Sequence, residues 1–161
     1  MAGIPLIYRL FFLVIEPISA LVGAYYAAGR PAEYLAYLTS APASTTDTPP
    51  TPTLSALYQL ANLYLLFALN EHLVLSSTTD RRTWRRLLTG LLIADFGHLA
   101  TMVPLAREKG FARVFLECAS WTAMEWGSVG FVYAGAAMRM SFLAGLGLGR
   151  ENGENGRQKN D

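Results

Sequence analysis

Four long apolar stretches run along the chain, separated by polar connections. They cover about residues 6–28, 54–75, 87–105 and 116–138. Each approaches or exceeds the roughly 20 residues that an α-helix needs to cross the hydrocarbon core of a bilayer. The pattern therefore predicts an all-α, integral membrane four-helix bundle, with one transmembrane domain over residues 1–148.

Helix-breaking and polar residues mark the connections. Residues 41–53 read APASTTDTPPTPT, a composition typical of an extended, mobile loop, and residues 34–38 before it predict a short interfacial segment. Residues 142–148 either prolong the last helix or lie at the membrane surface. The polar, Gly- and Asn-rich residues 149–161 predict a disordered tail.

Composition agrees with a chain divided by a bilayer. Hydrophobic residues make up 52% and charged residues 16%, whereas soluble domains carry about a quarter charged residues. The net charge of +1 gives no indication of nucleic-acid binding, and the single cysteine, Cys118, excludes an intramolecular disulfide. No phosphate-binding loop or common hydrolase motif occurs, so we expect no cofactor.

The distribution of Lys and Arg predicts the orientation. With both termini cytoplasmic, that side holds Arg9, the arginines at positions 81, 82, 85 and 86, and the basic residues of the tail. The other side holds Arg30, Arg107, Lys109 and Arg113. The positive-inside rule therefore favours cytoplasmic termini. We expect a multi-pass protein of the endoplasmic reticulum, the default membrane because no retention or lipidation signal is present.

Ionisable residues inside the predicted spans are the candidates for chemistry. An Asp or Arg at the centre of a membrane helix costs about 2.5–3.5 kcal/mol on insertion scales, so such groups usually face the bundle interior and mark a site. Six such groups in a small bundle favour a function over a purely structural role. They are Glu16, Glu71, His72, Asp95, His98 and Glu125.

Asp95 and His98 are three residues apart and share one face of the third predicted helix. A carboxylate beside an imidazole fixes its tautomer and raises its basicity, which suits an acid–base couple. The alternative is a buried polar pair that holds two helices together. Both interpretations fit the sequence about equally well.

Glu125 is the predicted acid of the fourth helix. A carboxyl in an apolar site stays protonated more readily and can donate a proton to an epoxide or alkene. Trp121 and Trp126 nearby could hold a developing carbocation by cation–π attraction, although packing or anchoring the helix is the more frequent role of such tryptophans. We name Glu125, Asp95, His98 and Glu71 as catalytic candidates.

The second predicted helix is the most polar. Gln59, Asn62 and Asn70 share a face, and Glu71 lies about 100° further round. We expect Asn70 and Glu71 to face the bundle, His72 to lie nearer the headgroups, and Gln59 and Asn62 to make interhelical hydrogen bonds.

Glu16 precedes Pro17 at a predicted kink and, with Asn70, Trp121 and Trp126, is a candidate substrate-binding residue. A carboxyl hydrogen-bonded to its neighbours is the alternative for Glu16. No Glu-x-x-His pair is present, so we expect no metal site.

Three blocks carry a resemblance: IYRLFFLVIEP, ANLYLLFALNEHLVL and LLIADFGHLATM. They resemble small four-span integral membrane proteins of filamentous fungi, a family largely of unknown function with some members in gene clusters for polyketides or terpenoids. The resemblance covers most of the chain outside the Thr/Pro loop and the tail. It implies a cyclase, isomerase or epoxide hydrolase of secondary metabolism. The layout is also loosely similar to the four-span sterol isomerase and sigma-2 receptor group, from which no site residue carries over.

Two functional hypotheses follow. The first is a membrane-embedded acid–base enzyme that acts on an apolar polyketide or terpenoid, alongside other membrane-bound biosynthetic enzymes. The second is a non-enzymatic lipid- or sterol-binding protein or membrane assembly protein. Proton-coupled transport is disfavoured because four spans are few for a transporter, unless the protein oligomerises.

Overall fold

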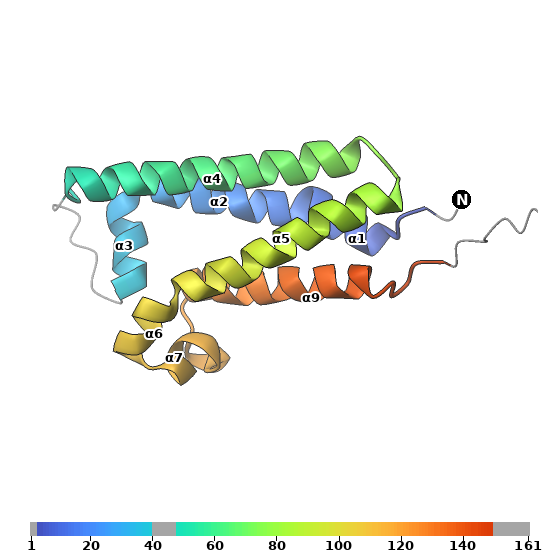
Figure 1. Ribbon diagram of the computed structural model, residues 1–161. Helices are drawn as coiled ribbons and strands as arrows, with labels where there is room; N and C mark the ends of the chain where they lie inside the picture. The colour runs from blue at the N-terminus through green and yellow to red at the C-terminus, as the bar shows by residue number, and fades with distance from the viewer. Residues whose placement is uncertain (1–2, 40–47, 150–161) are drawn as a thin grey trace, which may run out of the picture.

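The computed structural model describes residues 3–39 and 48–149, and within them every regular element is helical (Figure 1). The all-α prediction is therefore confirmed. The first half comprises α1 (Leu6–Leu10), the π-helix η1 (Phe11–Ile15), α2 (Glu16–Gly29), α3 (Pro31–Thr39) and α4 (Thr51–Ser76). The second half comprises α5 (Arg81–Thr101), α6 (Val103–Lys109), α7 (Phe111–Phe115), the 3-10 helix η2 (Cys118–Ser120), α8 (Ala123–Glu125), the π-helix η3 (Trp126–Gly130) and α9 (Phe131–Leu143).

Three helical stretches are long and apolar enough to cross a membrane. They are Leu6–Gly29, Thr51–Ser76 and Arg81–Lys109. The first two lie within about three residues of the predicted spans, and the third contains its predicted span. Large apolar side chains cover their outer faces, including Leu6 (76% exposed), Ile93 (68%) and Leu73 (59%). An apolar exterior of this kind is typical of a protein surrounded by lipid.

The fourth helical segment differs from the prediction. Residues 116–122 form turns and η2, and the continuous helix runs from Ala123 through η3 to Leu143. Thr122 begins the helix as an N-cap with Glu125 in a capping box, and Gly145 and Gly147, both at positive φ, follow its end. The predicted span of 116–138 is therefore displaced by five to seven residues along the chain.

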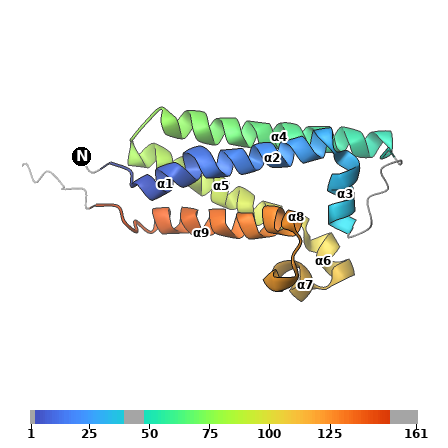
Figure 2. The same ribbon diagram turned by 180° about the vertical axis from the view of Figure 1, so that it is seen from behind.

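The long helices pack in two pairs. Helix α4 lies along α2, and α5 crosses to pack along α9 (Figure 1). The N-terminal end of α1, the turn between α4 and α5, and the C-terminal end of α9 lie at one end of the molecule, opposite α3, α6 and α7 (Figure 2). Residues 48–53 of the predicted loop of 41–53 are described, and Thr51 already begins α4, so the helix starts earlier than predicted. The predicted tail lies almost wholly outside the described residues.

A mainly aromatic cluster lies at the end of the molecule formed by α1, the turn between α4 and α5, and the C-terminal end of α9. Its buried members are Ile4, Tyr8, Phe12, Leu75, Trp84, Leu88 and Phe142. The Trp84 ring lies 5.6 Å from the Phe142 ring, and its indole N–H donates to the Thr78 carbonyl oxygen (2.9 Å). This cluster contains residues from all four long helical segments and fixes how far each helix is shifted along its neighbours. It therefore aligns the polar residues that lie deeper in the molecule.

The N-cap of α5 gives a first prediction. Asp80 accepts hydrogen bonds from the backbone N–H (2.9 Å) and hydroxyl (2.8 Å) of Thr83. These bonds lower the pKa of Asp80 below its usual value, so its stabilising contribution is full above the unfolded pKa and is lost as pH falls through the folded one. We expect Asp80→Ala to speed hydrogen exchange in the first turn of α5.

Asp80→Asn is the matched control, because asparagine caps helices about as well as aspartate. It should preserve slow exchange in that turn and also remove its acid sensitivity. Equal exchange in Asp80→Ala and the unmodified protein would show that the cap does not hold the helix start.

Candidate functional site

A cluster of four charged side chains lies inside the helices, and each comes from a different long segment. Arg139 of α9 is fully buried at its centre. Its Nη1 donates to Asp95 of α5 (2.7 Å), and its Nη2 donates to Glu16 of α2 (2.5 Å) and Glu71 of α4 (3.4 Å). Both glutamates accept from one nitrogen, so their carboxyl groups converge on the same point.

Helix periodicity explains why Glu71 and Asp95 face inward. On α4, Glu71 continues the buried row of Leu57, Ala61, Ala68 and Leu75. On α5, Asp95 lies seven residues after Leu88 and continues the row begun by Trp84. Residues separated by three, four or seven positions share a helix face. The apolar residues around each carboxyl therefore decide its direction.

The π-helix η1 brings Glu16 to the same point. Tyr8, Phe12 and Glu16 are all buried although they are spaced four residues apart, a spacing that drifts around a regular α-helix. The π-turn at Phe11–Ile15 takes up an extra residue and cancels this drift. The Phe12 ring then lies 5.6 Å from the Arg139 guanidinium carbon, within cation–π range.

Gly135 makes room for the cluster from within α9. A Cβ at this position would lie 2.7 Å from Arg139 Nη1 and 3.1 Å from Glu16 Oε1. Both distances are shorter than ordinary van der Waals contact. Arg139 would have to move to relieve the overlap, and its bonds to Asp95 and Glu16 would be disturbed.

We therefore expect Gly135→Ala to lower the free energy of unfolding by about 1–3 kcal/mol, the usual cost of overpacking. Gly97→Ala in α5 is the control, because an added Cβ there meets no atom within 4 Å and alanine favours helix. Thermal unfolding in detergent micelles measures both. Equal melting temperatures for the two variants would contradict the close approach at Gly135.

Three polar atoms of the cluster have no partner within the described residues. They are Glu16 Oε2, Glu71 Oε2 and Arg139 Nε, all buried. Two are carboxyl oxygens and one is a guanidinium donor. A buried polar group without a partner costs about 1–3 kcal/mol, and such groups mark positions where a ligand, water or proton can be held.

Asp95 and His98 do not form the predicted couple in this structure. Asp95 bonds to Arg139, whereas His98, one turn later, lies against the backbone of Ser128 in η3. The second ring nitrogen of His98, Nε2, is buried and has no partner in the described part of the chain. Asp95 therefore belongs to the charge cluster, and His98 faces a separate place next to η3.

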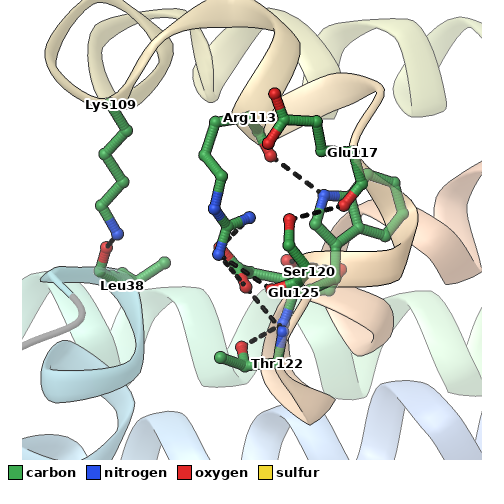
Figure 3. Close-up of polar contacts among 9 residues, drawn as sticks. Leu38, Lys109, Arg113, Glu117, Ser120, Thr122 and Glu125 are labelled. Carbon is green, nitrogen blue, oxygen red and sulfur yellow. Dashed lines mark hydrogen bonds and ion pairs between the residues drawn. The ribbon is translucent and has the colours of Figure 1, made fainter.

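Glu125 lies in a different polar site near the start of α8 (Figure 3). Its Oε2 accepts from the Thr122 backbone N–H (2.7 Å) and from Arg113 Nη2 (3.2 Å). Arg113 also donates to the Ser120 carbonyl oxygen (3.1 Å). These donors stabilise the carboxylate form, so the surroundings of Glu125 differ from the apolar site expected for a protonated acid.

The two candidate tryptophans lie with Glu125 rather than with Arg139. Trp121 is 8% exposed, and its indole N–H donates to the Arg113 carbonyl oxygen (3.1 Å). Trp126 is 50% exposed and contacts the Trp121 ring edge-to-face at 5.2 Å. In this same region Lys109 Nζ donates to the Leu38 carbonyl oxygen (2.5 Å, Figure 3), which joins α6 to α3.

The prediction that Asn70 faces the bundle was wrong. Glu71 is fully buried, but Asn70 is exposed on the outer face of α4. Gln59 and Asn62 are also exposed, so their predicted interhelical hydrogen bonds within the chain are absent from the described bonds. His72 is exposed, and its Nδ1 donates to the Leu13 carbonyl oxygen of η1 (2.8 Å).

Arg139 is absent from the candidate residues named from the sequence. An arginine at the end of an apolar run predicts a membrane-interface anchor, whereas the structure buries Arg139 completely. Two signals point to its burial. The Thr122-x-x-Glu125 capping box moves the helix start, and the buried carboxyls need a cation.

Across residues 3–39 and 48–149, no group of three or more His, Cys, Asp or Glu side chains could hold a metal ion.

These features define an all-helical protein with three helices of membrane-spanning length and a charge cluster buried among them. The chain belongs to a family described as a domain of unknown function, DUF7704, whose model matches residues 1–149. No curated protein and no solved structure matches the chain. The family description names no activity, so the buried charge cluster around Arg139 is the basis for assigning a function.

Proposed function

We propose that this chain is a multi-pass membrane enzyme that uses its buried cluster for acid–base chemistry on an apolar small molecule. The single observation that carries the proposal is the set of unpartnered atoms, Glu16 Oε2, Glu71 Oε2 and Arg139 Nε, in one buried place. Unsatisfied donors and acceptors that converge in a buried site are the groups a bound substrate or a transferred proton would occupy.

Four membrane crossings are part of this proposal. Three helices have the necessary length and hydropathy, and α8, η3 and α9 form a further continuous helix of comparable extent. An even number of crossings agrees with the described N- and C-terminal ends lying together in Figure 1. The arginines at the start of α5 lie at this same end, which supports a cytoplasmic position for both termini.

Charge balance supports a proton within the cluster. Glu16, Glu71 and Asp95 face one guanidinium, so full ionisation would leave a net charge of −2 inside the bundle. An uncompensated buried charge is costly, and neutralising a carboxyl removes that cost. Glu16 and Glu71 flank the same nitrogen, so a proton held between them would be placed for transfer.

The proposed chemistry begins with transfer of this proton from Glu71 to an epoxide oxygen or to an alkene carbon. Protonation of the epoxide lets its C–O bond break, and water or an internal nucleophile attacks the carbon. The attacking group then loses a proton to the carboxylate, which restores the acid. For an alkene, loss of a different proton to the cluster shifts the double bond. Arg139 would hold the carboxylate left by proton transfer.

We further propose a place in secondary metabolism, on a polyketide or terpenoid intermediate, in the membrane of the endoplasmic reticulum. Other membrane-bound enzymes would supply and consume such an apolar intermediate. The sequence resemblance and the bilayer-facing surface support this assignment. Catalytic roles for His98 and Glu125 stay predictions, and each would act at a place apart from Arg139.

A second candidate function has its own support. Arg139 connects three other helices, as an ion network with a structural role also would. The chain would then be a lipid- or sterol-binding protein or an assembly partner for membrane enzymes. Under this alternative, neutralising one carboxyl would change ligand affinity or assembly but would leave the host's metabolites chemically unchanged.

Metabolite profiling of the native host tests the proposal. The gene is deleted, and the strain is complemented with the unmodified chain, Glu71→Gln, Glu125→Gln or the control Gly97→Ala. We expect one apolar intermediate to accumulate in the deletion strain and in the Glu71→Gln strain, with the protein still present in membranes. Gly97→Ala should restore the original profile.

Three results would contradict the proposal. An unchanged profile after deletion would remove the enzymatic function. Full restoration of the metabolite profile by Glu71→Gln would show that the buried cluster is not the catalytic site. Loss of restoration by Glu125→Gln alone would indicate that the reaction takes place near Arg113 instead.

A further inference from the structure

The outer face of α4 carries polar side chains where a membrane helix should meet lipid. Gln59, Asn62 and Asn70 are all exposed, and none of them makes a side-chain hydrogen bond to another described residue. Yet α4 is one of the three helices with the length and hydropathy to cross a membrane. Amides that face hydrocarbon without a partner carry a desolvation cost that association with another helix removes.

The three amides form one stripe, directly opposite the packed face. At about 100° per residue they fall within an arc of about 80°, centred roughly 180° from the buried row that includes Leu57, Ala68 and Glu71. The stripe cannot contact α2 or α5 by a small rotation of α4, because such a rotation would expose Glu71. Residues 3–39 and 48–149 therefore offer the amides no partner, and a helix of another chain is the partner that fits a membrane-spanning segment.

The depth of the stripe strengthens this conclusion. Helix α4 runs from Thr51 to Ser76, so Asn62 lies within about 3 Å of its midpoint at 1.5 Å per residue. Near the midpoint of a span, neither water nor headgroups can reach the amide. Ser55, Gln59, Asn62, Leu66, Leu69 and Leu73 are exposed with alternating spacings of four and three, the repeat of a left-handed helix pair.

We propose that α4 pairs with α4 of a second copy of this chain, in a parallel homodimer whose interface is the Gln59–Asn62–Asn70 stripe. A carboxamide has both donor and acceptor atoms, so it can bond its own symmetry mate. Two copies with the same membrane orientation place each amide level with its counterpart. This proposal rests on the membrane crossing of α4 and is independent of any enzymatic activity.

The mass of the protein in detergent micelles tests the dimer. Analytical ultracentrifugation of the full chain should give two copies per particle. Replacing Gln59, Asn62 and Asn70 together with leucine should weaken dimerisation about tenfold or more, since several interhelical polar contacts are lost. Tyr58→Leu is the matched control, because this exposed side chain lies on α4 outside the stripe, and it should leave the dimer intact.

Disulfide cross-linking in native membranes provides a second measurement. Cys118 is replaced with serine, and Asn62→Cys or Leu65→Cys is introduced. We expect a strong cross-linked dimer for Asn62→Cys and a much weaker one for Leu65→Cys, which faces about 100° from the centre of the stripe. A monomeric unmodified protein, an unchanged dimer in the triple variant, or equal cross-linking at both positions would overturn the proposal. Failure of the chain to insert into membranes would instead contradict the membrane crossing itself.

Discussion

Arg139→Met is expected to lower the free energy of unfolding by about 3–5 kcal/mol, the cost of removing one partner from a buried ionic network. The variant keeps an unbranched apolar stem but removes the only cation that, among the described residues, is bonded to Glu16, Glu71 and Asp95. Those carboxyls would remain among apolar side chains without a counter-charge. Thermal unfolding in micelles, followed by circular dichroism, measures the loss.

Two further variants separate lost charge balance from lost packing. Arg113→Met removes the cation of the partly exposed pair with Glu125 and should cost at most about 1 kcal/mol. Combining Arg139→Met with amide replacements of the three cluster carboxyls should recover most of the lost stability. An Arg139→Met protein as stable as the original would contradict the ionic role of the cluster.

Glu71→Gln is expected to abolish activity while preserving the fold. Glutamine has nearly the same shape and keeps an oxygen that can accept from Arg139 Nη2, now 3.4 Å from the carboxylate. Because Glu71 carries the proton in this proposal, glutamine replaces a neutral carboxyl with a neutral amide, so stability should change by less than about 1 kcal/mol. Removal of a general acid should slow turnover by about 10²–10⁴-fold.

The comparison uses two measurements on the same variant: the melting temperature in micelles and restoration of the host's metabolite profile. Gly97→Ala is the control for the metabolite measurement, because an added Cβ at this position meets no atom within 4 Å. An unfolded Glu71→Gln protein would favour the structural interpretation of the cluster. A folded and fully active one would contradict the acid role.

Much of the fold could be predicted because its signals are local. Long apolar runs predict the first three helices, although α4 begins at Thr51, inside the predicted loop of 41–53. The start of the fourth helix was predicted at Leu116 because the apolar run begins there. The helix in fact begins after the capping box at Thr122, which hydropathy does not detect. Hydropathy reports where a chain is apolar, but only cap geometry shows where the helix begins.

The candidate site was predicted in part. Glu16, Glu71 and Asp95 were recognised as intramembrane ionisable residues, and the structure brings them together. Their common partner, Arg139, was not recognised, because a charge near the end of an apolar run usually marks the interface. Pairing between residues as far apart as Glu16 and Arg139 depends on tertiary packing, which a single sequence does not reveal.

The rotation of α4 shows a further limit of sequence reasoning. Its two polar faces, one with Glu71 and one with the amides, lie on opposite sides of the helix. Polarity alone favours neither face for the interior. The small residues next to each face decide which one packs inside, because Ala61 and Ala68 allow α2 to approach on the Glu71 side.

The proposed function depends on a transferable proton held in the buried cluster. Infrared difference spectroscopy of the protein in lipid tests it directly, because a protonated carboxyl has a carbonyl stretch that a carboxylate lacks. We expect this band at neutral pH in the unmodified protein, its loss or marked reduction in Glu71→Gln, and its persistence in Glu125→Gln. Absence of the band from the unmodified protein, or its full retention in Glu71→Gln, would contradict the claim.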